Sequence, residues 1–159
     1  MKDIQGLIPL TKAVHSMLNQ LGSLVGIEIK FEEIGRTAGI CFSSDTGTVV
    51  LEEIETITGG YERRCSYPFL VVYRSADTTE KTKFKAAEFL DLAGRWLTGE
   101  TVELDGRFYS VQVPELEDGR KIKKISTSNF YGLEPNQNGV QDWLLPVVVE
   151  YIQWKDEIF

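Results

Sequence analysis

Residues 67–74 of the chain read Tyr-Pro-Phe-Leu-Val-Val-Tyr-Arg. Apolar side chains occupy both alternating sets of positions in this run, which is typical of a strand whose two faces are both covered by other elements. Such a strand lies in the interior of a sheet. We therefore expect residues 67–74 to form the central strand of the fold, around which the other elements are arranged.

A long amphipathic helix is predicted directly after this strand. Asp77 followed by Glu80 fits a capping box, and Thr98 with Gly99 ends the helical pattern. Asp91 and Arg95 have the spacing of an ion pair on the solvent side. The apolar face is broad and contains Phe84, Ala86, Ala87, Phe89, Leu90, Ala93, Trp96 and Leu97.

A second helix is predicted before the central strand, from about residue 7 to residue 21. Its apolar residues recur at spacings of three and four, and Gly22 is expected to cap its C-terminus. The residues that form this stripe are Leu7, Leu10, Val14, Met17, Leu18 and Leu21.

The rest of the chain predicts strands. They are expected at residues 27–32, 37–42, 48–58, 101–104, 108–113, 121–130 and 140–154. Pro146 inside the last of them favours an edge position or a bulge. The element order predicts one domain over residues 1–159, with an α+β fold in which two helices pack on a mainly antiparallel sheet.

Composition limits the function classes. The chain has 17 basic and 24 acidic residues, a net charge of −7, and nothing in it predicts the basic face that phosphate binding requires. The start of the sequence lacks the pattern of a signal peptide, and no apolar run is long enough to span a membrane. Cys41 and Cys65 are expected to be reduced thiols of a protein made in the cytoplasm.

The sequence offers little for catalysis. His15 is the one histidine, too few ligands for the usual zinc sites, and the Gly59-Gly60 pair is not followed by the residues of a phosphate loop. Most carboxylates alternate with apolar residues on predicted strands, which favours a solvated sheet face. The alternative is a carboxylate pair that works as acid and base in a deep pocket. We expect no enzyme activity, no cofactor and no metal.

One segment has the composition of an interface. Gly59 and Gly60 form a flexible turn, and Tyr61, Arg63 and Arg64 follow it before the central strand. Arginine and tyrosine are enriched in interface cores, because a planar guanidinium and an aromatic ring give much contact area at low entropic cost. The alternative is an ordinary hairpin turn with solvated arginines.

Three runs together resemble a known family. They are Gly-Gly-Tyr-Glu-Arg at 59–63 continuing into residues 67–74, Phe-Leu-Asp-Leu-Ala-Gly-Arg-Trp-Leu at 89–97, and Asn-Gly-Val-Gln-Asp-Trp at 138–143 leading into Val-Val-Val-Glu-Tyr at 147–151. This pattern is similar to the minor capsid and tail terminator (head–tail joining) proteins of tailed phages and prophages of Gram-positive bacteria. The resemblance spans roughly residues 55–155.

The resemblance implies a structural virion protein of the tail or neck, assembled in the bacterial host cytoplasm. Proteins of this kind form a ring, usually a hexamer, that caps the tail tube, stops its polymerisation and meets the head connector proteins. DNA would pass through such an acidic ring without specific binding. No membrane is involved. The alternative from a different class is a monomeric cytosolic protein-binding module, such as an immunity or regulatory protein.

On this hypothesis the subunit contacts involve the 59–64 segment, the final strand and the exposed parts of the first helix. The segment is expected to be a loop that orders on assembly, with Arg63 and Arg64 pairing with carboxylates of a neighbour. The predicted interface residues are Gly59, Gly60, Tyr61, Arg63, Arg64, Trp143 and Tyr151.

Overall fold

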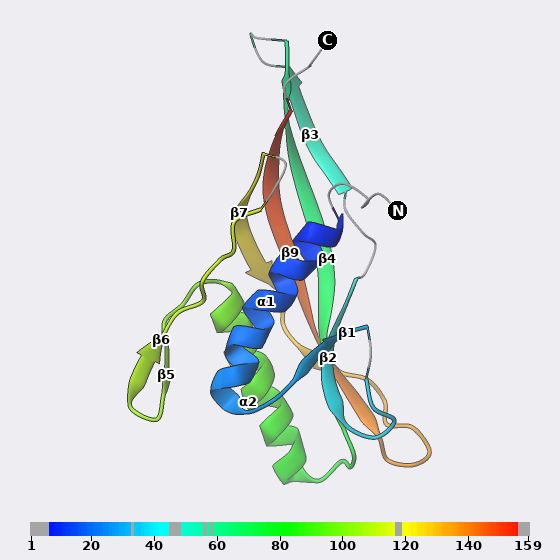
Figure 1. Cartoon of the computed structure of the whole chain (residues 1–159). Coiled ribbons are helices and arrows are strands. Elements are labelled where there is room, and N and C mark those ends of the chain that lie inside the picture. The colour runs from blue at the N-terminus through cyan, green and yellow to red at the C-terminus, as the bar shows by residue number, and fades with distance from the viewer. Residues whose placement is uncertain are drawn as a thin grey trace.

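The computed structural model describes residues 7–32, 34–44, 49–55, 57, 59–116 and 119–155. Its elements, in chain order, are α1 (Leu7–Val25), β1 (Ile29–Phe31), β2 (Gly39–Ser44), β3 (Val49–Glu55), β4 (Tyr61–Ser75), α2 (Glu80–Leu97), β5 (Val102–Leu104), β6 (Arg107–Tyr109), β7 (Arg120–Thr127), β8 (Tyr131–Gly132) and β9 (Gln141–Lys155). The expected α+β fold, with two helices and a mainly antiparallel sheet, is confirmed (Figure 1).

Two long strands form the centre of the main sheet. β4 and β9 are each 15 residues long and pair antiparallel over their whole length, from Tyr61 opposite Lys155 to Ser75 opposite Gln141. The central position expected for residues 67–74 is confirmed, and the strand begins earlier than expected, at Tyr61.

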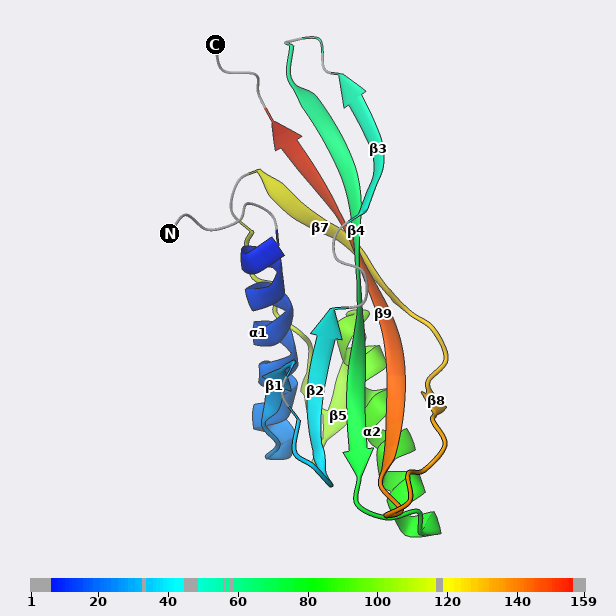
Figure 2. The same cartoon turned by 90° about the vertical axis from the view of Figure 1, so that its right-hand side faces the viewer.

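Each of these long strands is flanked on its outer side by two shorter strands, one along each half of its length. Along β4, β3 pairs with residues 61–66 and β2 with residues 69–74. Along β9, β7 pairs with residues 147–153 and β8 with residues 143–144. β1 extends the sheet beyond β2 and forms its parallel pair. The upper half of the sheet (β3, β4, β9, β7) therefore differs from the lower half in its outer strands (Figure 2).

The prediction that Pro146 marks an edge or a bulge was wrong, because β9 lies between β4 and β7. Pro146 stands just past the end of β7, where the adjacent chain leaves the ladder and the Ser128 N–H donates to the Pro146 carbonyl at 3.0 Å. Pro68 of β4 lies in the corresponding gap between β2 and β3. A proline lacks a backbone donor, so both prolines occupy the places where a neighbouring strand is interrupted.

One face of the sheet carries the core. Alternate residues of β4 are buried, and so are their partners on β9, while the residues between them are only half-buried. The expectation that both faces of β4 are covered was therefore wrong. The core residues of this face are Cys65, Tyr67, Phe69, Val71, Leu145, Val147, Val149 and Tyr151.

Helix α1 packs on this face with the predicted stripe, since Leu10, Val14, Met17, Leu18 and Leu21 are at most 1% exposed. The side chain of Leu7 lies outside the described residues, as do the ends of the strand expected at 48–58.

The end of α1 differs from the prediction. The helix continues past Gly22 to Val25, and Gly26 ends it with a φ of 74°. The Ile27 N–H donates to the Gly22 carbonyl at 2.8 Å, which makes a Schellman motif around Gly26. Gly22 has a different role, because a Cβ there would collide with the Ile27 carbonyl oxygen.

The N-cap of helix α2 lies two residues after the predicted cap, Asp77. Thr79 is the N-cap, its hydroxyl accepting from the Thr82 N–H, while Asp77 accepts from the Thr79 N–H at 3.0 Å. Hydrogen bonds from Thr82 and Thr79 lower the pKa of Asp77. The expected apolar face is confirmed except at Ala87, which is half-buried, and Phe84, which is 61% exposed.

The remaining strands follow the predicted order with shorter bounds. Asp105 and Gly106 form the turn of the β5–β6 hairpin. Their φ values of 51° and 77° are both positive, which a two-residue hairpin turn of type I′ requires. β6 ends at Tyr109, and the strand expected at 121–130 ends at Thr127. In the segment expected at 27–32, Ile29 is buried but Ile27 and Phe31 are about one-third exposed, at 37% and 39%.

Trp96 ties the helical layer together and yields a stability prediction. Its indole N–H donates to the Met17 carbonyl of α1 at 2.8 Å, and its side chain is 2% exposed. Trp96→Phe removes this bond and leaves a small void, so we expect the free energy of unfolding to fall by about 1–3 kcal/mol. Urea denaturation measures the loss. The matched change Trp154→Phe, at a residue 46% exposed, should stay within about 0.5 kcal/mol; equal losses would contradict this role of Trp96.

Candidate subunit interface

The predicted interface segment forms regular structure within the single chain. Tyr61, Arg63 and Arg64 belong to the first part of β4, and each pairs with β3 on one side and β9 on the other. Only Gly59 and Gly60 precede the strand, Gly59 with a φ of 88° that favours glycine. The expectation of a loop that orders on assembly is therefore corrected for Tyr61–Arg64.

The two arginines also have partners in their own chain. Arg63 Nε lies 3.3 Å from a carboxylate oxygen of Glu53, and Arg64 Nε lies 3.7 Å from one of Glu52. The Arg63 guanidinium also lies over the Tyr61 ring, 4.5 Å from its centroid. Within the chain Arg63 and Arg64 thus form cross-strand pairs between β3 and β4, and the expected pairing with carboxylates of a neighbour stays a prediction. All four charged side chains are at least one-third exposed, so these pairs contribute little stability.

The two aromatic residues predicted on the final strand lie elsewhere. Tyr151 is 2% exposed and packs in the core opposite Cys65, so it presents no surface to a neighbour. Trp143 is half-buried near the other end of β9, against Gly132 of β8. The structure thus brings Tyr61, Arg63 and Arg64 together at one end of the sheet and separates them from Trp143.

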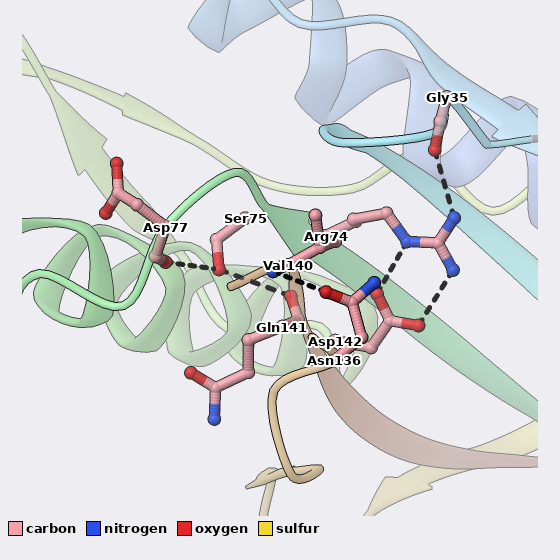
Figure 3. Close-up of polar contacts among 8 residues, drawn as sticks. All are labelled: Gly35, Arg74, Ser75, Asp77, Asn136, Val140, Gln141 and Asp142. Carbon is pink, nitrogen blue, oxygen red and sulfur yellow. Dashed lines mark hydrogen bonds and ion pairs between the residues drawn. The ribbon is translucent and has the colours of Figure 1, made fainter. Parts of the chain in front are cut away.

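A polar cluster at the other end of β4 and β9 was not predicted (Figure 3). Arg74 and Asp142 face each other across the two strands and form a two-pronged ion pair, with Nε–Oδ1 at 2.6 Å and Nη2–Oδ2 at 2.8 Å. Arg74 Nη1 also donates to the Gly35 carbonyl at 3.0 Å. The hydrogen bond to Asp142 raises the pKa of Arg74, so this guanidinium is permanently charged.

Neighbouring residues extend this cluster to the adjoining loops (Figure 3). The Ser75 hydroxyl lies within hydrogen-bonding distance of the carbonyls of Asp77, at 3.1 Å, and Gln141, at 3.2 Å. Asn136 Oδ1 accepts from the Val140 N–H at 3.0 Å, which shapes the loop before β9. The cluster connects the start of α2, both central strands and the connection between β1 and β2. We therefore interpret it as a cluster that stabilises the fold.

No catalytic constellation is formed by the residues that the structure describes. His15 Nε2 lies 2.9 Å from the Ile29 carbonyl, and its ring contacts Phe42. Burial raises the pKa of Cys41, which keeps the thiol protonated at neutral pH. Among the described residues no group of three potential metal ligands occurs, and none of their helices has the length and apolarity of a membrane span.

Comparison with known proteins gives one informative result. No protein-family model matches the sequence, and no curated protein matches it either. The fold, however, is similar to a chain in the solved structure described as "Virion of native gene transfer agent (GTA) particle". The TM-score is 0.55 at 15% sequence identity, and the match covers 96% of this chain and 99% of that chain. The chain thus shares its fold with a component of a virion particle.

The ion pair between Arg74 and Asp142 has a natural control in the same chain. Arg95 and Asp91 form an exposed pair on α2, with side chains 52% and 64% exposed against 25% and 24% for Arg74 and Asp142. Alanine double-mutant cycles followed by urea denaturation should give a coupling of about 1–2 kcal/mol for Arg74–Asp142. For Arg95–Asp91 we expect about 0.3–0.5 kcal/mol. Equal couplings would show that the first pair does not fasten the strands.

Proposed function

We propose that this chain is a structural subunit of a tailed virion or a phage-derived particle, acting as the tail terminator or head–tail joining protein. Copies of the chain form a ring, a hexamer, on the end of the tail tube. The ring stops tube polymerisation and presents its other face to the head connector.

The observation that carries this proposal is the extent of the structural similarity. The match to the gene transfer agent virion chain covers nearly all of both chains, so the two proteins correspond as whole domains and share more than a common motif. Because a fold by itself does not specify a function, the terminator role depends additionally on the resemblance of the 59–74, 89–97 and 138–151 runs to that family.

The charge and chemistry of the chain agree with a structural role. A net charge of −7 favours the passage of DNA through a ring without binding, because the protein and the phosphates repel each other. The described residues include no group of three potential metal ligands, and we propose that the protein is not an enzyme and uses no cofactor.

The exposed end of the sheet is the natural place for contacts within the particle. The end of the sheet where β4 and β3 pair extends past the helices (Figure 1). Tyr61, Arg63 and Arg64 of β4 pair there with β3, which carries Glu52 and Glu53. Exposed ion pairs rearrange easily because they contribute little stability, so these side chains are available to a neighbouring subunit or to the tube protein.

The proposal predicts a specific assembly behaviour. Light scattering across a concentration series should give the mass of a ring of several 18.0 kDa chains, either for the purified protein or after addition of tail tube protein. Negative-stain images should show that ring, and its addition should shorten tube polymers. A monomer that ignores tube protein at every concentration would contradict the proposal and favour the monomeric binding module.

A further inference from the structure

The upper half of the sheet has two open edges. In the part of the chain that the structure describes, β3 pairs with β4 alone and β7 pairs with β9 alone. The two strands lie on opposite margins of the sheet (Figure 1), and they are similar in length, with seven and eight residues. Each edge has unused backbone donors and acceptors that can add another strand.

The two edges carry opposite charges. β3 contains Glu52, Glu53 and Glu55 and no basic residue, whereas β7 contains Arg120, Lys121, Lys123 and Lys124 and no acidic residue. Arg63 and Arg64 balance part of the β3 charge from inside the sheet. A carboxylate accepts several hydrogen bonds, however, so these glutamates can also receive a cation from the open side. In a chain of net charge −7, the basic β7 edge is a local exception.

A groove lies beside β7. Its volume is about 850 Å³, and Lys121, Lys123 and Lys124 line it together with residues of the 111–116 segment and Trp154. Apolar side chains, among them Val111, Val113 and Ile125, form much of the rest of its wall. The groove therefore combines an open strand edge, an apolar wall and a row of lysines.

The β3 edge has the complementary features. Val50, Leu51 and Ile54 are 46–51% exposed, an unusual amount of apolar surface for an edge strand in water. They share the strand with the three glutamates, in the order Val50-Leu51-Glu52-Glu53-Ile54-Glu55. A copy of β3 thus offers apolar side chains for the wall of the groove and carboxylates for its lysines.

We propose that β3 of one copy lies in the groove of the next copy and adds to the edge of β7. This inference rests on the proposed ring and specifies its subunit interface. The three successive pairings β3–β4, β4–β9 and β9–β7 are all antiparallel, so β3 and β7 of one chain run in opposite directions. When copies repeat around an axis along the strands, each new β3–β7 contact is antiparallel as well.

The charges also select how the edges pair. Charged edge strands commonly protect a sheet from aggregation, and charges of one sign on both edges would give that protection. Opposite signs instead repel β3 from β3 and β7 from β7 while attracting β3 to β7. Such a contact joins two different surfaces, and a contact of this kind generates a closed ring when the rotation between copies permits it.

Charge exchange tests the pairing. Variant one carries Glu53→Lys and Glu55→Lys, so both of its edges are basic. Variant two carries Lys121→Glu and Lys123→Glu. Because Arg120 is buried, the exposed charges of its β7 are then two acidic residues and Lys124, so both of its edges are net acidic. Neither variant alone should form rings at concentrations up to about tenfold above the wild-type requirement, because like charges meet at every contact. An equimolar mixture should form rings again, because basic and acidic edges then alternate around the ring.

Two control variants have the same net charge changes at other exposed positions. They are Glu88→Lys with Glu103→Lys, and Lys81→Glu with Lys85→Glu, on α2 and β5. Both should assemble as the wild type does, with light scattering and negative stain as the measurements and tube protein present if the wild type requires it. Circular dichroism of each variant establishes that it is folded.

The outcomes separate this inference from the proposed function. If each edge variant alone forms rings as the wild type does, or if the equimolar mixture forms none, the β3–β7 pairing is overturned and the ring proposal remains. A wild type that forms no ring with or without tube protein would overturn both. Loss in the single variants with rescue in the mixture supports the pairing.

Discussion

The antiparallel ladder between β4 and β9 is the interaction on which the rest of the structure depends. It joins two strands of 15 residues without a register shift, and every other strand of the main sheet pairs with one of them or, in the case of β1, through β2. The core face that receives both helices consists largely of alternate side chains of these two strands. The ladder is fastened at its lower end by the Arg74–Asp142 ion pair.

The length of this ladder explains the two halves of the molecule. The helices pack over the lower and middle parts, while the upper part of β4 and β9 extends beyond them (Figure 2). Among the described residues, β3 and β7 flank this upper part. Each long strand is flanked by two short strands that follow one another along its length. Pro68 and Pro146 lie in the gaps between these short strands, where a missing backbone N–H removes no ladder hydrogen bond. The half flanked by β3 and β7 is thereby distinguished from the half flanked by β2 and β8 within one continuous sheet.

The sequence predicted the elements that local periodicity describes. Within the described residues, the stripe of α1, most of the apolar face of α2 and the central position of residues 67–74 were confirmed. Predictions that depended on tertiary context were less successful. Pro146 suggested an edge strand because the sequence does not show that β7 ends beside it. Gly22 suggested a helix end because the sequence does not show its close approach to the Ile27 carbonyl.

Predictions for the candidate interface likewise succeeded where local sequence was enough and failed where tertiary contacts decide. Arg63 and Arg64 were recognised as unusual residues, but their partners Glu52 and Glu53 are fixed by strand register, which the sequence did not define. Tyr151 has the composition signal of an interface residue and lies in the core, since alternation alone does not say which face of β9 is covered. The pairing of Arg74 with Asp142 across 68 positions of the chain had no local signal.

The separation of the two central strands in sequence has a consequence for how the chain folds. Ser75 and Gln141, which close one end of the ladder, are 66 positions apart, so the entropy of a long loop must be overcome before the ladder can form. Neither helix has a complete surface to pack on until that happens. Folding is therefore expected to be slow for a domain of this size, with α1 and α2 exposing apolar stripes in the meantime. Partly folded chains of this kind tend to aggregate, so we expect the chain to be most prone to aggregation before the ladder has formed.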